Sequence, residues 1–257
     1  FRFYIKDGSA VWNPGWQPTK TELDGYTCRH GLGYSVIEGR KNGILAAQTL
    51  LVPQGENCLL IRLTLKNETG TEKTLDTFPY VEFCLWDAMD DGSNFQRNFS
   101  IGEVEIEPDA LYHKTEYRER RNHYAVLWAN HPYDGFDTAR DAFIGPYGSP
   151  AMPQAVAAGR CTNSVAHGWA PVGAMQFHVT LLPGEEQTLM LGLGYIENPE
   201  AEKFSAPGVI NKVRAREMIA RYHTPAQFDK AMAALRVYWD GLLANYHAVT
   251  GDEKVDR

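Results

Sequence analysis

The chain has 257 residues, of which 44% are hydrophobic and 22% are charged, so its composition is that of a globular protein and not of a disordered one. At this length it can bury a substantial core, as one large all-β domain or two small ones. The net charge of −7 argues against nucleic acid or an anionic membrane as a partner, because both select basic surfaces, and no apolar run approaches a membrane span.

Most of residues 1–197 are predicted to form strands. Gly, Pro and Asn separate the strand-like segments, in turns such as 41–43, 67–70 and 183–185. The segments with the clearest strand composition carry β-branched and aromatic residues in partial alternation: 60–65, 73–86, 104–107, 123–128 and 175–182. Many strands at short intervals, without interleaved helices, predict a large antiparallel β-sandwich.

The pattern changes near Glu197, where a polar connection, 197–208, precedes two predicted helices, 209–221 and 225–248. Thr224 can cap the second helix, and Gln227 completes a capping box. The apolar residues of this helix fall on one face, which we expect to pack on the sandwich or on a following domain: Phe228, Met232, Leu235, Trp239, Leu242 and Tyr246. The predicted division is a sandwich domain, 1–197, and a helical linker, 198–257.

Two stretches between predicted strands concentrate arginine side chains. Residues 94–100 read NFQRNFS and residues 112–124 read YHKTEYRERRNHY. Guanidinium and amide groups offer several directed hydrogen bonds at once, which is what holding sugar hydroxyls or phosphate oxygens requires. A solvated charged strand, with glutamates paired to arginines, is the plainer interpretation from composition. The side chains concerned are Gln96, Arg97, Arg118, Arg120 and Arg121, with Glu116 and Glu119 as the pairing acids.

Carboxylate and histidine side chains could take part in acid–base or metal chemistry, but each also has a structural explanation. The carboxylates that could serve as a general acid are Asp87, Asp90, Asp91, Glu116 and Glu119. An acidic turn also explains the three aspartates, and their spacing matches no EF-hand calcium loop. His30 and His167 each precede glycine and lack the spacing of a metal pair, so a structural role is favoured. The HGLGY segment lacks the order of a nucleotide-binding loop.

Aromatic and thiol side chains leave similar alternatives. The tryptophans could stack on sugar rings or fill the core: Trp12, Trp16, Trp86, Trp128 and Trp169. The four cysteines, Cys28, Cys58, Cys84 and Cys161, contain no CxxC pair, which argues against a zinc ribbon or thioredoxin-type site. Free thiols of this kind suit a reducing compartment, and we expect a cytoplasmic protein.

An ordered set of motifs indicates a family: VWNPGW (11–16), CRHGLGY (28–34), LVPQGEN (51–57), YVEFCLWDAMDD (80–91), IGEVEIE (101–107), DGFDTARDAFIG (134–145), SVAHGW (164–169) and LGYIENP (193–199). In this order and spacing the chain resembles the N-terminal region of the cellobiose phosphorylases in glycoside hydrolase family 94, over nearly its whole length. The resemblance implies a galactose-mutarotase-like sandwich and two linker helices, followed by an (α/α)6 barrel that this chain lacks. In the family that barrel carries the general-acid Asp and the phosphate site, so no catalytic residue is expected here.

The resemblance also implies the activity and one site. The whole enzyme would convert cellobiose and phosphate to α-glucose 1-phosphate and glucose with inversion, as a homodimer, without a metal or organic cofactor. Within DDGSNFQRN (90–98), Gln96 and Arg97 match residues that help to form the family's acceptor-glucose subsite, while Phe95 replaces a Tyr of some members. Residues 112–121 also match the family closely, but the resemblance assigns them no specific contact. The alternatives are a phosphorylase for cellodextrins, laminaribiose or chitobiose, or a non-catalytic carbohydrate-binding or structural module.

Overall fold

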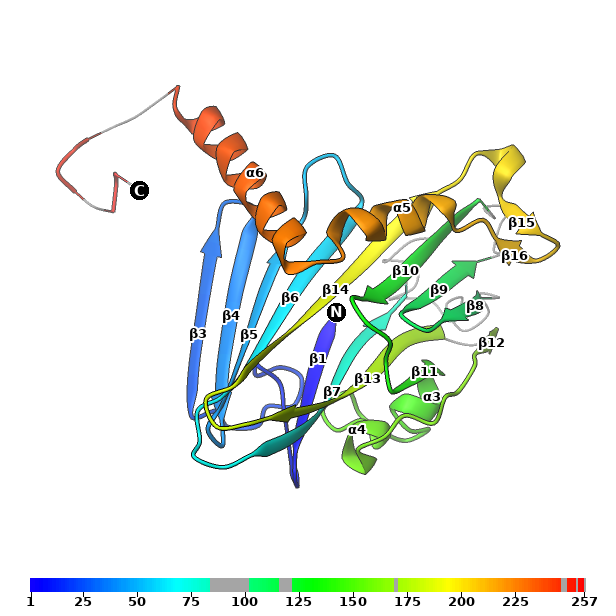
Figure 1. Cartoon of the computed structure of the whole chain (residues 1–257), viewed down its shortest axis with the longest axis horizontal. Helices are drawn as coiled ribbons and strands as arrows, with labels where there is room; N and C mark the ends of the chain where they lie inside the picture. Colours follow the sequence, from blue (N-terminus) through cyan, green and yellow to red (C-terminus); the bar gives the residue numbers. More distant parts are fainter. Residues whose placement is uncertain (84–101, 116–121, 169–170, 246–248, 253, 257) are drawn as a thin grey trace.

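The computed structural model describes residues 1–83, 102–115, 122–168, 171–245, 249–252 and 254–256. Within these residues, two antiparallel sheets of five and nine strands form a sandwich (Figure 1). The five-stranded sheet has the order β11 (Gly135–Ala139), β13 (Pro171–Leu181), β7 (Lys73–Glu82), β1 (Arg2–Asp7) and β2 (Ala10–Trp12). The nine-stranded sheet has the order β12 (His167–Gly168), β8 (Gly102–Glu107), β9 (Ala110–Thr115), β10 (His123–Ala129), β14 (Glu186–Glu197), β6 (Cys58–Asn67), β5 (Ile44–Leu51), β4 (Tyr34–Lys41) and β3 (Gly25–Gly31).

The principal core lies between the two sheets. Leu63 and Leu65 of β6 face Phe177 and Val179 of β13 in one buried cluster. Alternation within β6 explains this arrangement, because successive side chains of a strand point to opposite faces of the sheet. The predicted antiparallel β-sandwich is therefore confirmed.

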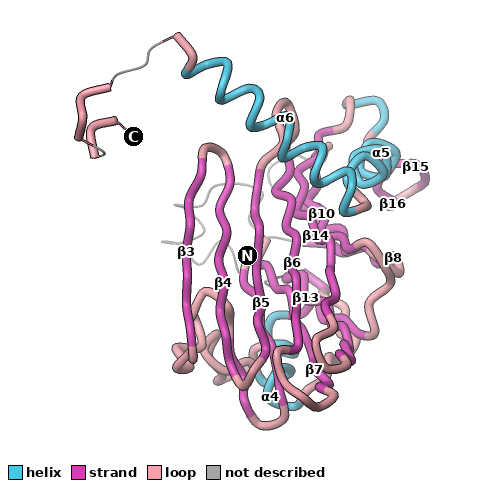
Figure 2. The backbone as a smooth tube through the Cα atoms, turned by 60° about the vertical axis from the view of Figure 1, so that its left-hand side comes forward, coloured by secondary structure: helices cyan, strands magenta, loops and turns pink. Residues whose placement is uncertain are grey.

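Helices cover the outer faces of both sheets (Figures 1 and 2). On the nine-stranded sheet, α5 (Val213–Tyr222) and α6 (Pro225–Leu243) bury Met218 and Phe228 against Tyr124 of β10 and its neighbours. On the five-stranded sheet, α3 (Arg140–Phe143) and α4 (Gln154–Ala158) close a second cluster, in which the Phe143 ring stacks on Tyr80 at 4.7 Å between centroids. The sequence pattern did not predict α3 and α4, because four or five residues are too short to show a helical period.

The linker region differs from its prediction at two points: α6 ends at Leu243, although this helix was expected to reach residue 248, and the first helix begins later than expected. The first helix was expected from residue 209, but Val209–Ile210 forms β16, which pairs with β15 (Phe204–Ala206) after a 3-10 turn at Glu200–Glu202. The hairpin is favoured because the backbone N–H of Ile210 donates to Glu105 of β8 at 2.7 Å. Helix α5 consequently begins at Val213.

The start of α6 follows its prediction. Thr224 and Gln227 form the predicted capping box. Phe228, Met232 and Leu235 of the predicted apolar face are buried on the sheet, whereas Leu242 is 51% exposed. Tyr246 lies outside the described residues, and the division at residue 197 stays a prediction. No helix in the described ranges is long and apolar enough to cross a membrane.

The HGLGY segment forms the β3–β4 hairpin and not a nucleotide loop. Gly31 pairs with Tyr34 across the turn. Gly33 has a φ of +79°, and a Cβ there would lie 2.9 Å from Leu235 and Trp239. Glycine therefore provides both the left-handed turn and the space in which α6 rests on the hairpin.

Candidate functional site

The residues predicted to contact sugar lie outside the described part of the chain. This applies to Gln96 and Arg97, and also to the following candidates: Phe95, Asp87, Asp90, Asp91, Glu116, Glu119, Arg118, Arg120, Arg121, Trp86 and Trp169. Their roles stay predictions. The described residues that flank them nevertheless define one end of the sandwich.

Strand pairing brings the flanks of both arginine-containing stretches together. The first stretch follows β7, which ends at Glu82, and precedes β8, which begins at Gly102. The second stretch begins within β9, whose Thr115 pairs with Gly102. The ring of Phe83, which directly follows β7, stacks on the ring of His113 of β9 at 5.0 Å between centroids. The described residues that flank the two stretches therefore lie at the same end of the molecule. The sequence alone did not show this proximity.

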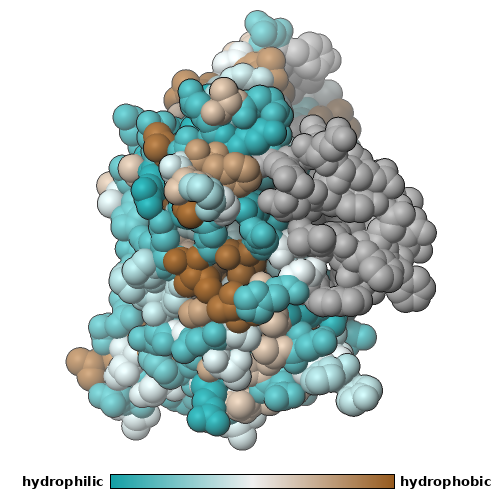
Figure 3. Space-filling view, turned by 90° about the vertical axis from the view of Figure 1, so that its right-hand side faces the viewer, coloured by the Kyte–Doolittle hydropathy of each residue, from teal (hydrophilic) through white to brown (hydrophobic). Residues whose placement is uncertain are grey.

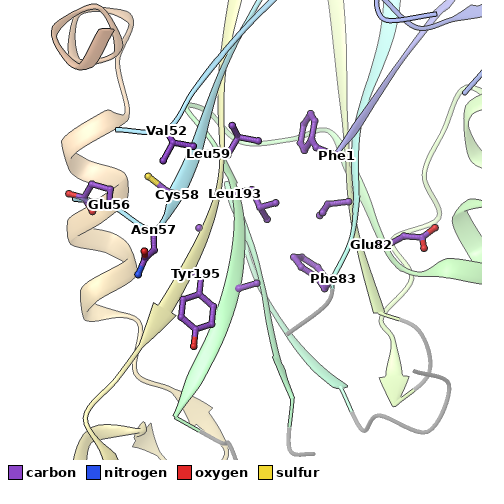
Figure 4. Close-up of a pocket in the computed structure, with 13 residues that line it drawn as sticks. Phe1, Val52, Glu56, Asn57, Cys58, Leu59, Glu82, Phe83, Leu193 and Tyr195 are labelled. Atoms are coloured by element: carbon purple, nitrogen blue, oxygen red, sulfur yellow. The ribbon is translucent and has the colours of Figure 1, made fainter. Parts of the chain in front are cut away.

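The side of the molecule that carries β8, β12 and the β15–β16 hairpin is mostly hydrophilic around a hydrophobic patch (Figure 3). A cavity of about 560 Å³ opens between the sheets, and Phe83 is one of its lining residues (Figure 4). Its walls are mostly apolar and come from β6, β7, β10 and β14: Leu59, Val81, Phe83, Ala125 and Leu193. The polar residues at its rim are Glu56, Asn57, Glu82 and Tyr195.

The rim carboxylates are held by cations. The Glu82 side chain points away from the cavity (Figure 4) and lies 3.3 Å from Nε of Arg140 and 3.5 Å from Nη1 of Arg2. It also accepts a hydrogen bond from the Tyr80 hydroxyl at 2.8 Å. Burial and then the charge of Glu82 raise the pKa of Tyr80. Glu56 is tied to Arg221 of α5 at 2.9 Å. Neither geometry resembles a carboxylic acid aimed at a leaving oxygen.

The described part of the second stretch is structural. The Tyr112 hydroxyl donates to Glu107 at 2.9 Å. Lys114 is 2% exposed, its Nζ lies 2.6 Å from Glu103, and it donates to the carbonyl of Gly208 at 2.9 Å. His113 is buried between the sheets, where desolvation lowers the pKa of its imidazole to about 4. Tyr112 thus ties β9 to β8, and Lys114 ties β9 to the turn of the β15–β16 hairpin.

The acidic strand EVEIE holds α5 against the sheet. Glu105 accepts from Lys212 at 2.5 Å, and Glu107 accepts from Arg216 at 2.6 Å. Burial alone would raise the pKa of Glu107, but the hydrogen bonds from Arg216 and Tyr112 lower the pKa overall. The carboxylates of this strand thus neutralise the cations of the linker.

The other candidates are dispersed. His30 and His167 lie on β3 and β12, the two edge strands of the nine-stranded sheet, so they cannot act as a pair. In the ranges that the structure describes, no group of three His, Cys, Asp or Glu side chains could hold a metal ion. Trp12 and Trp128 are fully buried in the core, while Trp16 is 44% exposed.

Comparison with known proteins agrees with the family that the motifs indicate. The family model described as glycosyl hydrolase 94, supersandwich domain, matches residues 2–225. An N,N'-diacetylchitobiose phosphorylase of Vibrio furnissii is 30% identical over 98% of this chain and 30% of its own length. The enzyme of the same name from Vibrio proteolyticus is 33% identical over the same shares. A solabiose phosphorylase of Paenibacillus borealis is 33% identical over 83% of this chain and 29% of its own length.

The chain therefore spans about 30% of the length of these relatives. Among solved structures, a putative kojibiose phosphorylase from the human microbiome aligns with a TM-score of 0.47 and 12% identity, over 92% of this chain and 24% of that chain. A putative aldose 1-epimerase of Escherichia coli aligns with a TM-score of 0.34 and 10% identity, over 76% of this chain and 79% of that chain. Both structural similarities are weak.

Proposed function

The chain belongs to glycosyl hydrolase family 94, as its supersandwich domain, and from this premise we propose that it is the N-terminal, non-catalytic part of an inverting disaccharide phosphorylase. The observation that carries the proposal is the family match over residues 2–225, together with relatives that are themselves named disaccharide phosphorylases. In the whole enzyme, phosphate attacks the anomeric carbon while an Asp of the barrel protonates the leaving oxygen. Because phosphate is the nucleophile, no second carboxylate is needed to activate water.

The described residues support the non-catalytic role of this part. The carboxylates near the cavity and along β8 are each paired with a cation: Glu56, Glu82, Glu103, Glu105 and Glu107. A general acid must keep a proton near neutral pH, whereas neighbouring cations favour the charged carboxylate. This part of the chain therefore serves as a scaffold, and we propose Gln96 and Arg97 as its contribution to the acceptor-sugar subsite.

We propose cellobiose as the substrate, on the ordered motifs and the DDGSNFQRN segment. Chitobiose is the second candidate, because two relatives named N,N'-diacetylchitobiose phosphorylase are 30% and 33% identical over 98% of this chain. The two sugars differ by N-acetyl groups, which require space and hydrogen-bond partners that hydroxyls do not. We further propose a cytoplasmic homodimer that needs no metal or organic cofactor.

Phosphate consumption by the full-length enzyme, measured with cellobiose, chitobiose, laminaribiose and solabiose, tests the substrate. We expect cellobiose to react at least about tenfold faster than the others, the discrimination that one poorly matched pocket group provides. Preference for chitobiose would replace cellobiose by the second candidate. A protein that binds these sugars but consumes no phosphate with any of them would be a binding module.

A further inference from the structure

A cysteine, a histidine and a serine form a cluster on the β3–β4 hairpin. This hairpin lies at the opposite edge of the nine-stranded sheet from β12 (Figure 1). Cys28 and His30 are two residues apart on β3 and therefore share a face. Ser35 lies on β4, directly opposite His30. The three side chains belong to neither the cavity nor the end of the sandwich that carries the proposed sugar site.

The imidazole of His30 links the other two side chains. Its Nδ1 lies 2.8 Å from Oγ of Ser35, and its Nε2 lies 3.3 Å from Sγ of Cys28. When Nδ1 carries the proton and donates it to Ser35, the Nε2 lone pair faces the thiol. This is the arrangement that nucleophilic cysteines use, in which a base within hydrogen-bond distance is oriented by a third group.

Among the described residues, the other two cysteines, Cys58 and Cys161, have no imidazole as a hydrogen-bond partner. Cys58 is 4% exposed, and burial raises the pKa of its thiol to about 12. Burial and then the charge of Asp137 raise the pKa of the Cys161 thiol. The thiolate is the reactive form of cysteine, so both of these residues are poor nucleophiles. Cys28 is partly exposed and lies beside an exposed imidazole.

We propose that Cys28 is a base-assisted nucleophilic thiol and a modification site for hydroperoxides, with His30 as the base and Ser35 as the residue that orients it. His30 Nε2 takes the thiol proton, and the sulfur attacks one peroxide oxygen. An S–O bond forms while the O–O bond breaks, and the departing hydroxide takes the proton from His30 and leaves as water. The sulfur is oxidised by two electrons to a sulfenic acid, and hydrogen peroxide is reduced to water.

The test uses the full-length protein at pH 7 with two reagents. Iodoacetamide alkylation is followed for each cysteine by peptide mass spectrometry, and sulfenic acid formed with hydrogen peroxide is trapped with dimedone. The variants are His30→Gln, which removes the base, and Ser35→Ala, which removes only its orienting group. His167→Gln is the matched control, because His167 is also exposed on an edge strand of the same sheet.

We expect Cys28 to be alkylated faster than Cys58 and Cys161, and to form the dimedone adduct. Loss of base assistance at a partly exposed thiol should slow its alkylation about tenfold in His30→Gln, with a smaller effect in Ser35→Ala and none in His167→Gln. The proposal is overturned if Cys28 reacts no faster than Cys58 and Cys161. It is equally overturned if His30→Gln reacts at the wild-type rate, or if peroxide gives no adduct at Cys28.

Discussion

His113 is a buried imidazole that the fold keeps neutral. It stacks on Phe83, and its Nδ1 has no hydrogen-bond partner among the residues that the structure describes. Desolvation penalises the charged form of a buried group, which is why its pKa falls from 6.5 to about 4. This residue therefore couples the stability of the sandwich to pH.

Replacing His113 by Phe should remove this coupling. The pKa of His113 is lower in the folded state than in the unfolded chain, so between pH 6.5 and about 4 the unfolded chain binds more protons. The stabilising contribution that is present above pH 6.5 is therefore lost as the pH falls through this range. The loss corresponds to about 3 kcal/mol at 1.36 kcal/mol per pKa unit. The free energy of unfolding, measured with urea at pH 7 and at pH 4.5, checks this loss. The wild type should lose more stability than His113→Phe, and equal losses would contradict the prediction.

Arg97 is the residue on which the proposed acceptor site depends. In the full-length enzyme, Arg97→Ala should weaken the use of glucose in the synthetic direction by about 1.5–3 kcal/mol, the value of a charge-assisted contact. The apparent affinity for phosphate and the Tm should change little. Arg29→Ala is the matched control, because Arg29 forms an exposed ion pair with Glu38. Unchanged glucose kinetics with a lowered Tm would make Arg97 a structural residue.

Single residues also show where sequence reasoning stops. Composition could not distinguish core tryptophans from sugar-stacking ones, and the structure buries Trp12 and Trp128 while leaving Trp16 partly exposed. The sequence did identify Tyr112, His113 and Lys114 as part of a chemically rich stretch. Their contacts with Glu107, Phe83 and Glu103 depend on strand pairing, which no local pattern reveals.

Among the elements, α5 is held by charge as well as by apolar packing. Glu105 accepts from both Lys212 and the backbone of Ile210. The side chain of Lys212 is only 10% exposed. In Glu105→Ala its remaining partner is Glu107, which is more distant at 3.9 Å. We expect a loss of about 2 kcal/mol in unfolding free energy.

Chemical denaturation of Glu105→Ala checks this value, with Glu68→Ala as the control. Glu68 forms a more exposed bridge to Arg40, so its loss should cost less than about 0.5 kcal/mol. A result in which the two variants lose equal stability would show that the EVEIE strand does not anchor α5.

The C-terminal end of α6 leaves apolar side chains uncovered in this part of the protein. Leu242 and Leu243 are each 51% exposed and Val237 is 72% exposed, whereas Phe228 and Leu235 pack on the sheet. Exposed apolar groups of this kind favour association. Residues 1–257 should therefore self-associate with increasing concentration in light scattering.

Substitutions on α6 localise the surface responsible. Leu243→Glu should weaken the association without lowering the Tm, because this side chain is not in the core. Trp239→Glu should weaken the association and also lower the Tm, because the Trp239 ring packs against the buried cluster beneath the helix. A fragment that stays monomeric at high concentration would contradict the prediction.

The elements also differ in how far the sequence specifies them. The start of α6 was predictable because Thr224, Pro225 and Gln227 act locally. Val209–Ile210 was assigned to a helix because two residues carry no period. These residues form a strand by pairing with β15, and the backbone N–H of Ile210 also donates to Glu105. The sandwich itself was predictable from many short strands, but the order of strands within the two sheets was not.

For the molecule as a whole, the carboxylates at the cavity and along β8 are paired with cations, and the proposed function assigns the general acid to the barrel. Purified residues 1–257 should therefore produce no sugar 1-phosphate from cellobiose and phosphate. An assay for glucose 1-phosphate at high protein concentration, with the full-length enzyme as the positive control, checks this. Activity of the fragment would place the catalytic acid within this chain and contradict its proposed role as a scaffold.

The most direct test follows the reaction of the full-length enzyme with its preferred disaccharide by proton NMR, with and without phosphate. The account predicts that cleavage requires phosphate and that the first product is the α-anomer of the sugar 1-phosphate, formed with inversion of a β-linkage. Cleavage to two free sugars without phosphate, or initial formation of the β-phosphate, would contradict it.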